Sequence, residues 1–131
     1  MNNRFKFRVW DKLAKRMIYP HNDNQQHFII DLNGQFHNLQ NGSGGDDYVI
    51  QQYTGLTDSN DDPIYEGDIL KNHYDVGNNI IGQVLYESDH GGYIFQWKRK
   101  GRGQDYKNLN CDVAFESVIV GNIFENPELL N

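Results

Sequence analysis

The chain has 131 residues, with thirteen glycines, fifteen Phe and Tyr residues and only two alanines, a composition that favours strands joined by turns over helices. The formal net charge of −6 opposes long-range attraction to nucleic acid, and the single cysteine excludes an intrachain disulfide or a site of several thiolates. No apolar run approaches the ~20 residues of a membrane span, so we expect a cytoplasmic protein that makes no membrane contact.

The charge is distributed unevenly along the chain. Residues 1–20 carry six basic side chains and one acidic side chain, whereas residues 21–76 carry one basic and ten acidic side chains. The remaining residues carry five basic and seven acidic side chains. The basic start can therefore pair with the acidic middle, within one subunit or between two copies.

The first twenty residues predict a hairpin. Phe5, Phe7 and Val9 alternate with other side chains, which is the period-two pattern of a strand with one buried face. Asp11 is expected to start the turn, because its carboxylate can accept nearby backbone amides, and residues 17–19 form the returning strand.

A second hairpin follows. The strand-like runs 27–32 and 35–39 flank Asn33-Gly34, the dipeptide preferred in a two-residue type I′ turn. Residues 40–47 contain no side chain that could anchor them in a core, and we expect a flexible, glycine-rich linker there. The predicted division is an N-terminal β-hairpin subdomain, residues 1–47, and a second subdomain, residues 48–131.

The second subdomain predicts a small barrel. Short strands are expected at 68–73, 80–87, 93–100 and 117–124, a spacing typical of a sandwich or barrel. The polar stretch 101–110 is expected to be a loop. Near the end, Asn126 can cap one short helical turn that begins at Pro127, because proline is favoured at the first helical position.

Three parts of the chain resemble the YopX protein family, which is carried mostly by bacteriophages and prophages. They are residues 52–58 (QYTGLTD) with 64–70 (IYEGDIL), residues 120–130 (VGNIFENPELL) and residues 7–11 (FRVWD). The resemblance implies a small, predominantly β protein, and it supplies no activity, cofactor or catalytic residue.

The first of these parts indicates a particular architecture. Glu66-Gly67-Asp68-Ile69-Leu70 looks like the opening of an SH3-like barrel strand. We therefore predict an all-β fold, with N-terminal antiparallel hairpins packed on a C-terminal, SH3-like, partly open β-barrel. The signature residues are expected to be structural and to build the joint between the two parts. They are Tyr53, Gly55, Tyr65, Glu66, Gly67, Asp68, Gly121 and Asn122.

One acidic segment has part of a calcium-loop pattern. Asp58, Asn60 and Asp62 have the spacing of the first three ligands of an EF-hand. However, Pro63 stands where the loop needs glycine, and Ile69 stands where it needs a bidentate glutamate. We therefore interpret the segment as a solvated turn whose carboxylates accept backbone amides.

Glu66 and Asp68 form a second acidic pair, and paired carboxylates can share a proton or hold a divalent metal. The sequence favours a structural use, in which one of them accepts a backbone amide or pairs with Arg8 or Arg16. Cys111 lies in an Asn-Cys-Asp turn with no base indicated nearby. We expect no catalytic residue, cofactor or metal, and no enzymatic activity.

The five histidines form no metal-binding motif in the sequence, and we expect surface or structural roles for each. They are His21, His27, His37, His73 and His90.

A candidate nucleic-acid strand lies near residue 95. Tyr93, Phe95 and Trp97 alternate just before a basic cluster. Its members are Lys98, Arg99, Lys100 and Arg102. Aromatic rings beside basic side chains can stack bases and neutralise phosphates. The same alternation is typical of a buried strand face that ends in a solvated loop, and the sequence favours this second interpretation.

For function, the sequence favours a non-enzymatic phage or prophage accessory protein. It is expected to bind an unknown host or phage macromolecule, or to assemble with itself as a homo-oligomer, because small β domains with several edge strands associate unless the edges are blunted. A nucleic-acid-binding small-barrel protein is the alternative.

Overall fold

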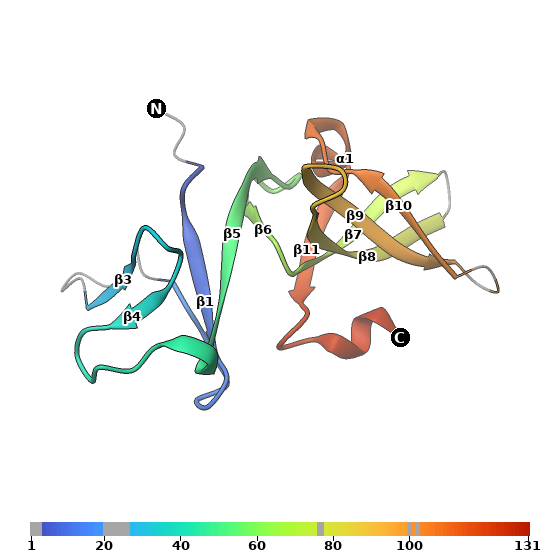
Figure 1. Ribbon diagram of the computed structural model, residues 1–131. Coiled ribbons are helices and arrows are strands. Elements are labelled where there is room, and N and C mark those ends of the chain that lie inside the picture. Colours follow the sequence, from blue (N-terminus) through green and yellow to red (C-terminus); the bar gives the residue numbers. More distant parts are fainter. Residues whose placement is uncertain (1–3, 20–26, 76–77, 100, 102) are drawn as a thin grey trace. The chain divides into compact units, whose positions relative to one another are not determined.

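The computed structural model describes residues 4–19, 27–75, 78–99, 101 and 103–131, and the predicted all-β fold is confirmed (Figure 1). The strands are β1 Phe7–Asp11, β2 Arg16–Ile18, β3 Phe28–Ile30, β4 Phe36–Asn38, β5 Tyr48–Thr57, β6 Pro63–Tyr65, β7 Asp68–Asp75, β8 Asn78–Glu87, β9 Gly92–Arg99, β10 Gly103–Asn108 and β11 Ser117–Asn122. The helix α1 is Cys111–Phe115, and two 3-10 turns are η2 Gly45–Asp47 and η3 Pro127–Leu130. Within the described ranges, no helix has the length and apolar character that crossing a membrane requires.

The chain forms two compact units, which we call the hairpin unit, Phe5–Gln52, and the barrel unit, Tyr53–Asn131 together with Arg4. Strand β5 contributes its first residues to one unit and its last residues to the other. The predicted linker, residues 40–47, lies inside the hairpin unit. There the Gly42 amide donates to the carbonyl of Asn38 at 2.8 Å, and η2 follows. The division between the units thus follows Gln52 and not Asp47.

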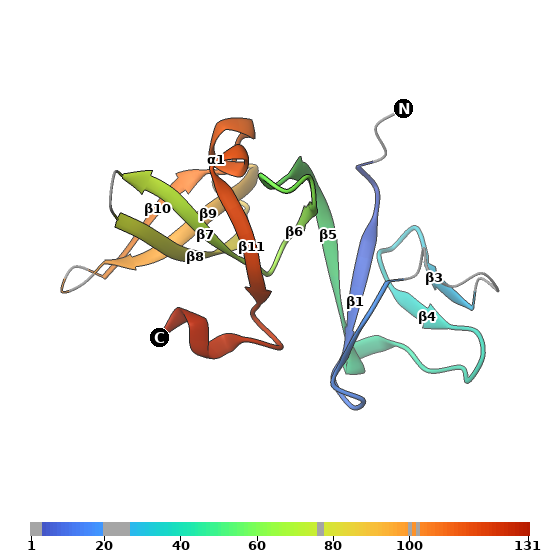
Figure 2. The same ribbon diagram turned by 180° about the vertical axis from the view of Figure 1, so that it is seen from behind.

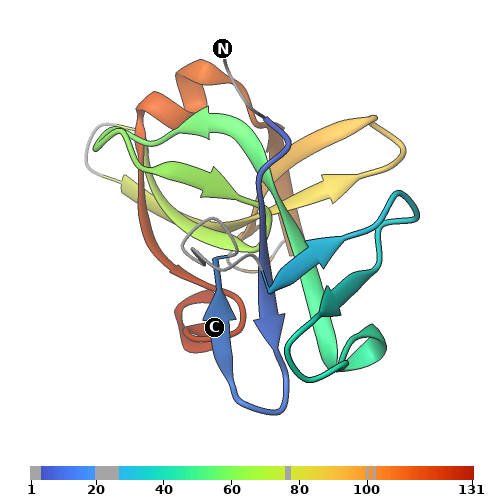
Figure 3. The ribbon, with the colours of Figure 1, turned by 90° about the vertical axis from the view of Figure 1, so that its left-hand side faces the viewer.

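In the hairpin unit, β1 pairs with β2 on one side and with β5 on the other (Figure 3, blue and green strands). The alternation predicted for β1 is wrong, because residues 8–11 are all buried and Phe5 is 63% exposed. Val9 enters the apolar core. On the other face, Nε of Arg8 donates to Oε1 of Gln51 at 2.8 Å, so a buried polar pair replaces the expected solvated face.

The turn between β1 and β2 agrees with the prediction. Oδ1 of Asp11 accepts the backbone amides of Leu13 and Ala14 at 3.1 and 3.0 Å. The carboxylate therefore starts the turn by satisfying amides that the hairpin leaves unpaired.

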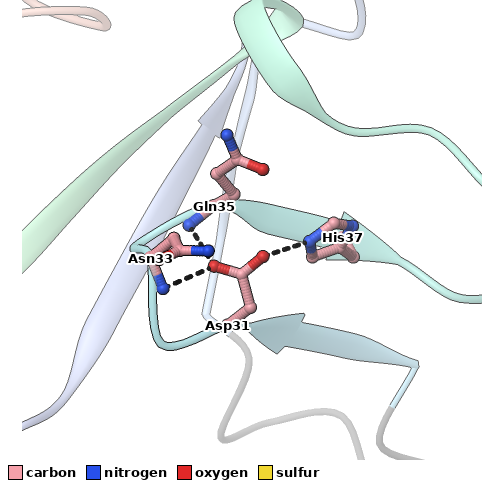
Figure 4. A network of polar contacts seen from close by, with 4 residues as sticks. All are labelled: Asp31, Asn33, Gln35 and His37. Atoms are coloured by element: carbon pink, nitrogen blue, oxygen red, sulfur yellow. Dashed lines mark hydrogen bonds and ion pairs between the residues drawn. The ribbon is translucent and has the colours of Figure 1, made fainter.

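The turn between β3 and β4 is wider than the predicted two-residue turn. Ile30 pairs with Phe36, so residues 31–35 form the loop. Asp31 causes the difference, because its Oδ1 accepts the backbone amides of Asn33 at 2.9 Å and of Gln35 at 3.0 Å (Figure 4). The carboxylate organises a loop that a type I′ turn would not need.

Oδ2 of Asp31 lies 2.9 Å from Nε2 of His37 (Figure 4). Two hydrogen bonds hold the pKa of Asp31 below its ordinary value of 3.8. The bond from the Gln35 amide has the larger effect, and the bond with His37 has the next largest.

The barrel unit contains a five-stranded antiparallel sheet in the order β10-β9-β8-β7-β11 (Figure 2). β10 and β11 lie at the two ends of this order, as expected for a partly open, SH3-like barrel. The inner face carries Leu70, Val84 and Phe95, which pack with Ile64 of β6 and with Val113 of α1. Burying these side chains supplies the main stabilisation of the unit.

Three elements of the barrel unit were not predicted, namely β6, β10 and α1. β10 occupies most of the stretch expected to be a loop, and its polar composition suits an exposed strand at the end of a sheet. The helix α1 follows, with Oδ1 of Asn110 accepting the Val113 amide at 2.9 Å as its N-cap. Cys111 is exposed at the start of this helix and not in a turn.

The C-terminal helical turn is confirmed as η3, with Pro127 at its start, and it packs against β8. The predicted capping role of Asn126 is wrong, because the side chain makes no capping hydrogen bond. Its Oδ1 accepts the Asn122 amide at 3.3 Å. This places Leu130 beside the outer face of the sheet, where it lines a pocket.

Candidate functional site

The acidic turn after β5 is built around Asp58. This carboxylate is only 4% exposed, which differs from the solvated turn predicted for it. Oδ1 accepts the backbone amides of Asn60 and Asp62, each at 2.9 Å, and Oδ2 accepts the Ile119 amide of β11 at 2.9 Å. Both oxygens therefore bond the protein itself, and the turn is attached to the edge strand β11.

The second acidic pair is divided between two environments. Asp68 is 2% exposed, and its Oδ2 accepts the Tyr65 amide at 2.8 Å. Glu66 is half-buried. Burial, and then the charge of Glu66, raise the pKa of the Tyr93 hydroxyl above its ordinary value.

The signature residues converge within the barrel unit. The rings of Tyr53 and Tyr65 lie 5.8 Å apart between centroids. The Gly67 carbonyl accepts the Ile123 amide at 2.9 Å, and a side chain at Gly121 would meet Asn126 Oδ1 at 2.5 Å. Their packing joins β5, β6, β7 and β11. That the signature residues also join the barrel unit to the hairpin unit remains a prediction.

The histidines of the described segments are dispersed. His37 contacts Asp31, His73 Nδ1 lies 2.7 Å from Asn79 Oδ1, and the ring of His90 meets Tyr106 edge-on. His21 lies outside the described residues. Among those that are described, no group of three or more His, Cys, Asp or Glu side chains is placed to hold a metal ion.

The strand predicted to bind nucleic acid through its aromatic face has that face in the core. Phe95 is 1% exposed and lies 5.4 Å from the Trp97 ring, and Tyr93 packs on the same core. The structure therefore agrees with the interpretation that the sequence favoured, in which these three rings belong to the core.

The basic residues at the end of β9 point to opposite faces of the sheet, because side chains alternate along a strand. Lys98 is exposed on the outer face, whereas Nη1 of Arg99 pairs with Oδ2 of Asp105 at 3.4 Å. Lys100 and Arg102 lie outside the described residues.

The opposite, outer face of the sheet is apolar and buried at Ile69 and Ile94 and is polar beside them. Residues directly opposite in antiparallel strands share a face, and the register pairs Gln83 of β8 with Gln96 of β9, and Gln96 with Tyr106 of β10. The next row contains Lys98 opposite Gln104, and Lys71 opposite Ile81. We call this surface the polar face and define it by six side chains. They are Lys71, Gln83, Gln96, Lys98, Gln104 and Tyr106.

A pocket of about 190 Å³ is hollowed into the polar face. Its lining comes from β8, β9 and β10, with one further residue from η3. The lining residues are Ile81, Gln83, Gln96, Trp97, Lys98, Gln104 and Leu130. The pocket thus combines amide groups and one ammonium group with an apolar rim.

The polar groups around this pocket have no partners within the described part of the chain. The side chains of Gln83, Gln96 and Gln104 make no hydrogen bond to another described residue, and neither do those of Lys71 and Lys98. Within that part of the chain, the pocket included, every buried side-chain nitrogen and oxygen has a hydrogen-bond partner. The amide and ammonium groups around the pocket are therefore open to solvent, where a ligand can reach them.

Comparison with protein families matches residues 6–131 to the family described as YopX protein. The chain belongs to the YopX family. Among solved structures, the YopX-family chain is similar to the crystal structure of protein EF1440 from Enterococcus faecalis, with 27% sequence identity and a TM-score of 0.55. That match covers 96% of this chain and 97% of the other. A comparison with curated proteins found no match.

Sequence reasoning named Lys98 but missed the rest of the polar face. On β9 it also pointed to Tyr93, Phe95 and Trp97, whereas half-buried Gln96 lies on the outer face together with Lys98. The alternation itself carried the signal, because a strand with core aromatics on one face presents its other side chains on the opposite face. Their convergence with Gln83 and Gln104 depends on strand register, which alternation alone does not provide.

Proposed function

We propose that this YopX-family chain is a non-enzymatic phage or prophage accessory protein, and that it binds a macromolecule through the polar face of its barrel unit. The observation that carries the proposal is the set of unpartnered amide and ammonium groups around the pocket. Polar groups in a concavity cost free energy when they lose water without a partner, so such a cluster suits a ligand that supplies hydrogen bonds.

The carboxylates of Asp58 and Asp68 support a role without covalent chemistry. A catalytic carboxylate must reach substrate, whereas Asp58 uses both oxygens to accept backbone amides and Asp68 accepts the Tyr65 amide. The family signature thus maintains the barrel, and the surface that it supports is free to bind.

A photo-crosslinking amino acid at exposed Gln104 tests this proposal in cells that carry the prophage. We expect a discrete crosslinked macromolecule, and we expect the yield to fall when Gln83 and Gln96 are both changed to alanine. The same crosslinker at exposed Lys12 of the hairpin unit is the control. No adduct at Gln104, or one unaffected by the double substitution, would refute the proposal.

Self-association is a second candidate, favoured by exposed apolar side chains of the hairpin unit. Leu13 and Leu32 are 78% and 106% exposed, and Leu39 is 60% exposed. Such side chains are suited to an interface between copies. Light scattering across a range of protein concentrations tests this candidate, because a mass that stays at one chain throughout would exclude it.

A further inference from the structure

The hydrogen-bonding capacity of the pocket restricts what it can bind. Each glutamine offers two N–H donors and a carbonyl acceptor, so Gln83 and Gln96 together require a ligand with both donors and acceptors in one plane or edge. A phosphate group alone offers only acceptors. The edges of nucleic acid bases offer both, and glutamine is well suited to bind them.

The charges beside the pocket select for an anionic ligand. Lys98 lines the pocket, and Lys71 lies in the same row on β7, with Ile81 of β8 opposite it. The residues that line the pocket include one lysine, Lys98, and no carboxylate. Asp105, on β10, lies opposite Trp97 on the other face and pairs with Arg99. The polar face is thus locally basic within a chain of net charge −6.

Tyr106 adds an aromatic surface at the end of the glutamine row. Its side chain is 48% exposed, and its register partner is Gln96. The ring of His90 meets it edge-on at 5.0 Å between centroids, which helps to hold its orientation. An exposed ring beside hydrogen-bonding groups can stack an unpaired base.

From these observations we propose that the polar face binds single-stranded nucleic acid. The inference rests on the proposed function and identifies the partner. One base enters the pocket and bonds the amides of Gln83 and Gln96, a neighbouring base stacks on Tyr106, and the backbone phosphates pair with Lys71 and Lys98. A duplex hides its base edges and faces in the stack, so it does not fit this arrangement.

The proposal predicts a specific salt dependence. When two phosphates of a single strand are neutralised, the logarithm of the association constant should fall with the logarithm of the salt concentration with a slope of about −1.4. Each phosphate contributes about −0.7 to this slope. Affinity should therefore fall about sevenfold for a fourfold rise in salt. Removing one lysine should bring the slope to about −0.7.

Fluorescence anisotropy with short labelled DNA and RNA strands tests the inference on the full chain. The variants are Lys98→Gln, Lys71→Gln and the double change Gln83→Ala with Gln96→Ala. Lys12→Gln, which removes one charge from an exposed site in the hairpin unit, is the control. Circular dichroism and thermal unfolding of each variant show whether it has folded.

We expect salt-dependent binding of single strands, a reduced slope for each lysine variant and roughly fivefold or greater weakening for the glutamine pair. The control should bind as the unaltered chain does. Absence of binding at high micromolar protein, equal binding of duplex or mononucleotide, or binding that all face variants retain would each overturn the inference. If the crosslinker at Gln104 captures a protein and the adduct survives nuclease treatment, the polar face still binds a macromolecule. In that case only the assignment of the partner as nucleic acid fails.

Discussion

Oδ2 of Asp58 accepts a hydrogen bond from the backbone amide of Ile119 at 2.9 Å. The bond attaches the turn at residues 58–62 to β11, an edge strand of the barrel sheet. The Ser59 amide donates to the carbonyl of Ser117 at 2.9 Å beside it, so the same turn satisfies a donor and an acceptor of that edge. The turn that begins at Asp58 is therefore attached to one edge of the barrel sheet.

Replacing Asp58 by alanine should destabilise the chain by about 3 kcal/mol, because three backbone amides lose a charged acceptor and two of them lie in the turn itself. Urea unfolding measures the loss. The control is Asp62→Ala, since Asp62 is exposed and contributes its backbone to the turn. Equal free energies of unfolding for the two variants would show that the hydrogen bond to β11 does not stabilise the fold.

A buried polar network beneath α1 predicts a coupled loss. Nδ2 of Asn72 donates to Ser117 Oγ at 2.7 Å and to the Val113 carbonyl at 3.2 Å, and Ser117 Oγ donates to the same carbonyl at 2.6 Å. Asn72→Ala should cost about 2–3 kcal/mol and Ser117→Ala about 1–2 kcal/mol. The double variant should lose less than the sum, because both changes break one network. Strict additivity in denaturant unfolding would contradict this.

Asp31 predicts a change of behaviour in acid. Its pKa in the folded chain is lowered by the Gln35 amide and then by His37, so its stabilising effect is complete above the ordinary value of 3.8 and is lost as pH falls through the lowered folded pKa. Carbon-detected NMR titration should give a midpoint below 3.8 for this carboxyl. The variant His37→Ala should move the midpoint upward, and an unchanged midpoint would exclude the contact with His37.

Asp105 predicts a change in self-association. Its Oδ1 accepts the Tyr106 amide of the edge strand β10 at 2.9 Å, and its Oδ2 pairs with Arg99. A charged side chain on an edge strand hinders pairing with another chain. Asp105→Ala should therefore raise the concentration dependence of the mass measured by light scattering. Asp89→Ala, an exposed carboxylate in the β8–β9 turn, should leave it unchanged, and identical behaviour of both variants would argue against an edge role.

The sequence predicted most of the barrel because its core strands carry a strong local pattern. Leu70, Val84 and Phe95 lie in runs whose composition and turns indicate strands without reference to the rest of the chain. β10 was missed because an exposed edge strand such as Gly103–Asn108 needs no apolar pattern. The five-residue helix α1 was missed because it is too short to show a helical period.

The candidate site was harder to predict than the fold. The aromatic residues of β9 were recognised as core residues or base-stacking residues, and burial of Phe95 decides for the core. The polar face is assembled from four strands by register, so Gln83, Gln96 and Gln104 have no distinctive spacing in the sequence. The contact of Asp58 with Ile119 likewise depends on how the barrel closes, which local pattern does not contain.

The most direct test of the binding account is an NMR titration that follows the side-chain amide resonances of Gln83, Gln96 and Gln104 while a short single strand is added. We predict that these three resonances shift together and saturate, whereas the side-chain amide of Asn41, in the hairpin unit, stays in place. Shifts confined to the hairpin unit, or no shift at saturating strand, would contradict the assignment of the polar face as the binding surface.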